Sequence, residues 1–123
     1  NNIAALFQDK GDFQSALNYY REALTLFKAQ KNKLMVADVL NNIAGIYYSI
    51  ELYELALPNY KEALTIYTKE GADEKAGFLW LNLANIYTKT GRTKIAREHF
   101  QKAYPILKAK NDSSFAILAS LAR

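Results

Sequence analysis

The chain has 123 residues, of which 50% are apolar and 23% are charged, and its net charge is +4. This composition is typical of a globular domain, and the length is enough for one domain but too short for two independent cores. It contains no cysteine, which excludes disulfides and thiolate metal sites. Because no apolar run approaches the ~18 residues that span a bilayer and no signal peptide is recognisable, we expect a cytoplasmic protein without membrane insertion.

Apolar residues recur three or four positions apart along most of the chain, which indicates helices and not strands. In chain order, the pattern predicts helices at about 1–10, 13–31, 33–50, 53–70, 73–90 and 93–110, and part of a seventh after Asp112. We expect the helices to form antiparallel pairs. Pro58 and Pro105 should bend their helices without ending them, because the apolar stripe continues past both.

Short turns separate the predicted helices. Lys10-Gly11-Asp12 and Thr90-Gly91-Arg92 supply glycine, which tolerates the left-handed conformation at a helix end, and Asp12 can cap the helix that follows. Glu51-Leu52 stands at the equivalent place in the middle of the chain, so we expect packing to hold that turn. Glu70-Gly71-Ala72-Asp73 and Lys110-Asn111-Asp112-Ser113 give further stop-and-cap signals.

One motif occurs three times at equal intervals. The copies begin at Asn1, Asn41 and Leu81, and the first two are identical at eleven equivalent places. Such a long period indicates stacked repeats, which build surfaces that hold partners. We therefore expect a single domain over 1–123 with repeats at about 1–32, 33–72 and 73–112 and the start of a fourth at 113–123. Because both ends cut through a repeat, we interpret the chain as an excerpt of a longer solenoid.

Small and large apolar residues recur at equivalent places in the three copies. We expect the small ones to let helices approach closely and the large ones to fill the space between them, which avoids voids. The small residues are Ala4, Ala44, Ala84, Ala16, Ala56, Ala96, Ala23, Ala63 and Ala103, and the large ones are Tyr20, Tyr60 and Phe100.

These residues carry a family resemblance. Trp80-x2-Leu83-Ala84-x2-Tyr87, then Ala96-x3-Phe100, resembles the tetratricopeptide repeat pattern W-x2-L-G-x2-Y…A-x3-F…P. Alanine replaces the glycine, and Lys28, Thr68 and Lys108 stand at the place of the closing proline. This long form of the repeat is similar to the repeats of kinesin light chains, of polarity-complex adaptors with GoLoco motifs, and of bacterial sensor kinases and regulators. The resemblance implies an all-α, right-handed solenoid that binds a peptide or protein segment in a concave groove, within a signalling or scaffold protein.

Nothing in the sequence indicates catalysis. There is no GxxxxGK(S/T), GxGxxG or HExxH motif, and we interpret His99, the only histidine, as a surface or packing residue. Tyr20, Tyr47, Tyr60, Tyr67 and Tyr87 fall at core spacing, and residues 41–80 are acidic, which argues against nucleic-acid binding. We therefore expect no enzyme, no cofactor and no metal.

Basic residues gather in the last third of the chain. Residues 81–123 carry eight basic and two acidic side chains. This excess either steers an acidic partner or is a solvated helix face that includes Lys94, Arg97, Lys108 and Lys110.

The resemblance implies that the first helix of each pair lines the groove. The groove stripe that its spacing defines runs through Asn2, Ala5 and Asp9, through Asp38, Asn42, Gly45 and Ser49, and through Phe78, Asn82, Asn85 and Lys89. Asn2, Asn42 and Asn82 recur once per repeat, and an amide that both donates and accepts suits a peptide backbone. In related repeats, asparagines at this place clamp a peptide main chain. The alternative is that they bond within the array.

The charges along the stripe predict the chemistry of the partner. We expect an extended segment with a basic residue toward Asp9 and Asp38 and an apolar and acidic portion toward Phe78 and Lys89. Two alternatives stay open. The protein's own flanking helix occupies the groove, or the chain is a structural spacer that self-associates through the repeat ends near Ile3, Phe7, Leu118 and Leu121.

Overall fold

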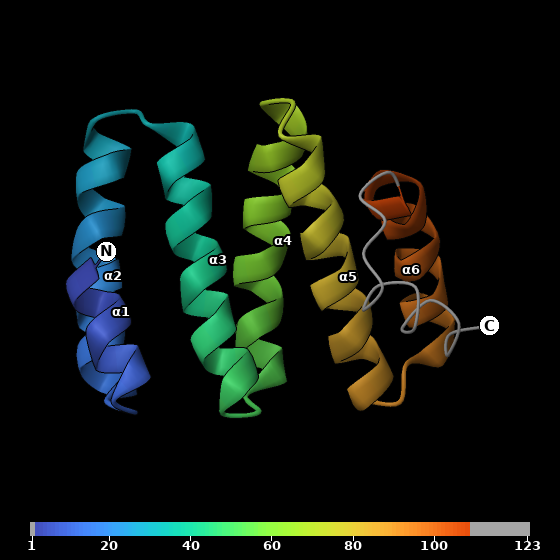
Figure 1. The fold of residues 1–123 in the computed structure, drawn as a ribbon, viewed down its shortest axis with the longest axis horizontal. Helices are drawn as coiled ribbons and strands as arrows, with labels where there is room; N and C mark the ends of the chain where they lie inside the picture. The colour runs from blue at the N-terminus through green and yellow to red at the C-terminus, as the bar shows by residue number, and fades with distance from the viewer. Residues whose placement is uncertain (1, 109–123) are drawn as a thin grey trace. The chain divides into compact units, whose positions relative to one another are not determined.

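A computed structural model describes residues 2–108 (Figure 1). These residues form α1 (Asn2–Asp9), α2 (Phe13–Ala29), α3 (Lys33–Ser49), α4 (Tyr53–Lys69), α5 (Asp73–Lys89) and α6 (Thr93–Lys108). The six predicted helices are confirmed, and their ends lie close to the predicted ones. The seventh helix and the fourth repeat were predicted for residues that lie outside this range.

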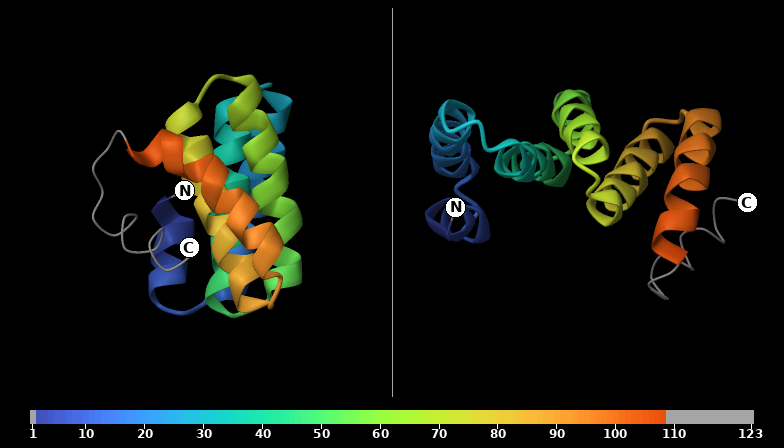
Figure 2. Two further views of the ribbon diagram at one scale, coloured as in Figure 1. Left: turned by 90° about the vertical axis from the view of Figure 1, so that its right-hand side faces the viewer. Right: turned by 90° about the horizontal axis from the view of Figure 1, so that it is seen from above.

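The chain divides into two compact units, the first ending at Ile66 and the second beginning at Tyr67. Within the first unit, α1 packs on α2 and α2 packs on α3, each pair antiparallel, and the next turn brings α4 back beside α3 (Figure 1). Within the second unit, α5 and α6 form one antiparallel pair (Figure 2).

The buried residues include those that the small–large pattern selects. Ala16, Ala44, Ala56, Ala63, Ala84 and Ala103 have no exposed surface, and Tyr20, Tyr60 and Phe100 are also buried. Ala23 is the exception and is half-buried. Pro58 and Pro105 lie inside α4 and α6, which continue past them as predicted.

The turns between the described helices share one backbone geometry and follow one another at equal intervals along the chain. The residue with positive φ is Gly11, Lys31, Glu51, Gly71 or Gly91, with φ between 57° and 81°. The N–H of the following residue then donates to the carbonyl five positions earlier, as from Asp12 to Phe7 at 2.8 Å and from Leu52 to Tyr47 at 2.8 Å. This is the hydrogen bonding of a helix that ends in a left-handed residue. The turn at Glu51 therefore closes as the glycine turns do, which the absence of glycine had not indicated.

We expect Glu51→Gly to stabilise the fold by about 0.5–1 kcal/mol. The left-handed conformation costs a residue with a Cβ roughly 1–2 kcal/mol, and the larger entropy loss of glycine cancels part of the gain. Urea unfolding measures the change. The reverse substitution, Gly91→Ala at φ 80°, should lower the free energy of unfolding by a similar amount. Equal midpoints for the two variants would contradict this account of the turns.

The helix caps agree with the sequence in one place and differ in two. Asp12 caps α2 as predicted, since its carboxylate accepts from the Ser15 N–H at 3.2 Å. Asn32 caps α3 in the same way, which the prediction did not include. At the start of α5 the N-cap residue is Ala72, whose side chain cannot accept a hydrogen bond from the helix. Asp73 is instead in the first turn of the helix, where the dipole favours a carboxylate.

Candidate functional site

In the first unit, part of the groove stripe lies on one face of α3. Asp38, Asn42 and Gly45 are half-buried and Ser49 is exposed, with spacings of three or four residues that place them on the same side of the helix. The Ser49 hydroxyl donates to the carbonyl of Ile46 at 2.8 Å. On α1, Ala5 and Asp9 are exposed, and the side chain of Asn2 lies outside the described part of the chain.

The middle of this face combines an unpaired amide with open space. The side chain of Asn42 makes no hydrogen bond to another described residue. A Cβ added at Gly45 would meet only the Tyr60 Oη, at 4.0 Å. Burial, with the negative charge of an ionised Tyr48, raises the pKa of Tyr60 to about 12, so its hydroxyl remains protonated at neutral pH and can donate. The face thus offers an amide, room for a small group and a neutral hydroxyl.

The hydroxyl of Tyr60 was missed as a candidate because its spacing marks Tyr60 as a core residue. The sequence feature that could have indicated this site is Gly45. Gly45 stands where the other two copies have Ala5 and Asn85. The missing side chain leaves space at this place that the other two copies fill.

In the second unit, the remaining stripe residues lie on α5. Asn82 and Asn85 are half-buried, and neither side chain bonds to another described residue. Phe78 is 38% exposed, and Lys89 is exposed. This face therefore presents two unpaired amides with an apolar and a basic neighbour along one helix.

His99 packs in an aromatic cluster of the second unit. Its ring centroid lies 5.2 Å from that of Trp80 and 5.0 Å from that of Tyr87. Its Nδ1 lies 2.9 Å from the carbonyl oxygen of Ile95. Arg92 and Lys102 cover the rings of Tyr87 and Trp80, at 4.9 Å and 5.0 Å from the ring centroids. The packing interpretation of His99 is therefore confirmed.

The other predicted surface and core residues also have definite places. Lys94, Arg97 and Lys108 are exposed, and Lys110 lies outside the described range. Tyr20, Tyr60, Tyr67 and Tyr87 are buried, and Tyr47 is half-buried, with its hydroxyl accepting from Arg21 at 3.0 Å. Among residues 2–108, no three His, Asp or Glu side chains gather in a way that could hold a metal ion. No helix in that range combines the length and the apolar character needed to cross a membrane.

Solved structures share the fold of this chain. Aspartyl phosphate phosphatase F from Bacillus subtilis matches with a TM-score of 0.88 and 20% identity over 98% of this chain and 31% of that chain. BtubC (BKLC) from P. vanneervenii matches with a TM-score of 0.77 and 22% identity over 87% of this chain and 44% of that one. A putative kinesin light chain with nearly identical TPR-like repeats, from Podosopora anserina, matches with a TM-score of 0.78 and 15% identity over 98% and 62%.

This chain thus spans between 31% and 62% of the length of those proteins. At such identities the likeness establishes the fold alone, and the predicted all-α solenoid class is confirmed. No curated protein sequence matches the chain. A sequence model described as "Tetratricopeptide repeat" matches residues 1–69 and 35–109, which together cover most of the chain. The chain belongs to the tetratricopeptide repeat family.

Proposed function

We propose that this chain is a binding module that holds an extended peptide or protein segment against the exposed faces of its first helices. Tetratricopeptide repeats generally mediate protein–protein interaction. The observation that carries the proposal is that Asn42, Asn82 and Asn85 are half-buried and make no hydrogen bond to another described residue. The amide atoms of these half-buried side chains remain accessible, so a peptide backbone, which both donates and accepts, can bond to them.

On α3, the proposal gives each residue a distinct role. Asn42 bonds the peptide backbone, and the space beside Gly45 admits a small side chain that reaches the hydroxyl of Tyr60. Asp38 favours a basic residue on the segment. An exposed charge contact contributes only ~0–1 kcal/mol, so it selects the orientation of the segment more than its affinity.

On α5, Asn82 and Asn85 bond the backbone, Phe78 packs against an apolar side chain and Lys89 favours an acidic one. Asn2 on α1 continues the series, and Ser49 borders it on α3. We propose that the module works within a larger signalling or scaffold protein and has no catalytic role, since the tetratricopeptide fold is typically non-enzymatic. The phosphatase activity in the name of the Bacillus subtilis protein belongs to that protein.

A peptide-library screen on the folded chain tests the proposal. For any segment that binds, we expect Asn42→Ala and Asn82→Ala each to weaken binding about two- to ten-fold, the value of one hydrogen bond of about 0.5–1.5 kcal/mol. Isothermal titration measures the change. Asn18→Ala is the control, because Asn18 is exposed on α2 and accepts a bond only from Gln14 of the same helix. If neither asparagine variant differs from the control, these amides do not bind the segment.

Exposed apolar residues on α1 favour a second candidate function, self-association. Ile3 is 54% exposed and Leu6 is 58% exposed. Phe7 is half-buried and stacks on Tyr19 with ring centroids 5.5 Å apart, so it contributes less free surface than predicted. Leu118 and Leu121 lie outside the described residues. Light scattering over a range of concentrations separates the candidates, since a strict monomer removes this one.

A further inference from the structure

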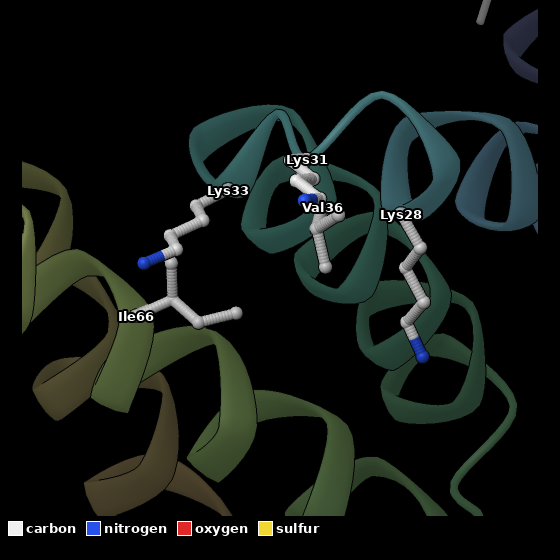
Figure 3. A pocket seen from close by; sticks show the side chains of 5 residues that line it. All are labelled: Lys28, Lys31, Lys33, Val36 and Ile66. Atoms are coloured by element: carbon white, nitrogen blue, oxygen red, sulfur yellow. The ribbon is translucent and has the colours of Figure 1, made fainter.

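A small hollow of about 310 Å³ opens in the first unit where α2 ends and α3 begins (Figure 3). Val36 and Ile66 form its apolar wall, and Lys28, Lys31 and Lys33 surround it; these five residues are called the lysine pocket. Val36 is 7% exposed, whereas the three lysines are exposed. The lining of the pocket is almost wholly apolar, so the lysines line it with their carbon chains, while their exposed ammonium groups make the surrounding surface positive.

The lysine pocket is separate from the groove stripe. Val36 and Gly45 both belong to α3 and are nine residues apart, which is two and a half turns at ~3.6 residues a turn. Their side-chain positions therefore point in opposite directions from the helix axis. A ligand in the pocket does not compete for the face that carries Asn42.

The three ammonium groups have no counter-charge of their own. Neither Lys28, Lys31 nor Lys33 makes a side-chain ion pair, hydrogen bond or ring contact with another described residue. Three exposed positive charges beside one apolar hollow raise the positive potential there. An anionic group is attracted to this potential.

The backbone at Lys31 has the geometry of the other helix-ending turns. Lys31 has φ 57°, the left-handed conformation that glycine adopts at the equivalent turns of Gly11, Gly71 and Gly91. The lysine therefore carries a conformational cost that glycine would avoid. This cost belongs to the turn that ends α2, which the N–H of Lys31 helps to close by donating to the carbonyl of Lys28 at 3.0 Å. Glu51 carries the same strain at the other end of α3 and does not line the pocket.

We propose that the lysine pocket binds an acidic peptide segment that carries one aliphatic side chain. The aliphatic group enters the hollow against Val36 and Ile66, and carboxylates on either side of it pair with the lysines. A volume of 310 Å³ is at the small end of ligand pockets, which are ~300–1,000 Å³, so it fits one side chain and its adjoining backbone.

The probe for this site is a blocked pentapeptide with a central leucine and two glutamates on each side. Methyl NMR of the whole chain follows Val36 and Ile66 during titration. We expect the methyl signals of both residues to shift with this peptide. Replacing the leucine of the peptide by serine should weaken its affinity at least five-fold, and replacing its glutamates by lysines should abolish the shifts. Equal affinity for the serine peptide would show general attraction of anions, nucleic acids included, and would overturn the proposal. Shifts confined to other residues would overturn it as well.

Paired variants separate binding from stability. Lys31→Gly should stabilise the fold yet weaken peptide binding about two- to five-fold, whereas Glu51→Gly should stabilise it without changing affinity. Lys28→Gln together with Lys33→Gln should weaken binding about ten-fold, and Lys94→Gln together with Arg97→Gln on α6 should not. Unchanged affinity in both pocket variants would overturn the proposal. Asn42→Ala should leave this affinity unaffected, so the proposal for the lysine pocket and the proposal for the groove stripe can be tested independently.

Discussion

Ala56→Leu should destabilise the fold by about 1–3 kcal/mol or more, because the added side chain overpacks a filled contact. Ala56 has no exposed surface and lies in α4 beside the buried Leu57 and Tyr60 of the same helix. Neighbouring atoms must move to accept a leucine at this place. The midpoint of urea unfolding, at an unchanged slope, measures the loss.

Ala29→Leu is the matched control. Ala29 is exposed at the end of α2, so the same added atoms extend into solvent and should change the free energy of unfolding by less than about 0.5 kcal/mol. Equal shifts of the midpoint for Ala56→Leu and Ala29→Leu would mean that the assignment of helix faces is wrong.

Gly77→Ala and Gly45→Ala should change stability in opposite directions, although both add one methyl group to a helix. A Cβ at Gly77 would lie 2.6 Å from Ile106 Cγ2, 3.0 Å from Ile106 Cβ and 3.2 Å from Leu107 Cδ2. Since Leu107 is 1% exposed and held by its surroundings, we expect a loss of about 1–3 kcal/mol. A Cβ at Gly45 meets only Tyr60 Oη, so the helix propensity of alanine should stabilise by up to ~1 kcal/mol.

Thermal unfolding of the two glycine variants decides the prediction by its sign. Adding Ile106→Ala to Gly77→Ala removes the contacting Cγ2 and should make the two changes cost less together than the sum of the single changes. A stabilising Gly77→Ala would show that the α5–α6 contact has room that the distances do not indicate.

The helices and the core could be predicted from the sequence because two independent periods report on them. Apolar spacing of three or four residues locates the helices, and the longer repeat locates the close contacts, as at Ala16, Ala56 and Ala96. The exposures on α3 and α5 also suit the predicted stripe, but no ligand role follows from exposure. The roles of Asn42 and Asn82 stay predictions until a segment is bound.

Other features could not be read from residue types. Glu51 adopts a backbone conformation that favours glycine, so its residue type gives no indication of the turn there. Only its position midway between Lys31 and Gly71 indicates that turn. The lysine pocket depends on packing, because Val36 and Ile66 both line it although they belong to different helices and lie thirty residues apart in the chain. In the sequence alone, nothing distinguishes the three lysines from other solvated residues at the ends of helices.

The regular turns bear on how such a chain can lengthen. Left-handed residues recur twice in each repeat, as at Gly11 and Lys31, whereas each kind of core side chain recurs once, as at Ala16 and Ala56. An insertion half a repeat long would keep every turn and every helix length, yet it would exchange the two kinds of helix downstream and expose residues meant for burial. Only the duplication of a whole repeat preserves both periods. Growth and loss of units in this chain are therefore constrained by its side chains to whole pairs of helices, although its backbone alone would permit single ones.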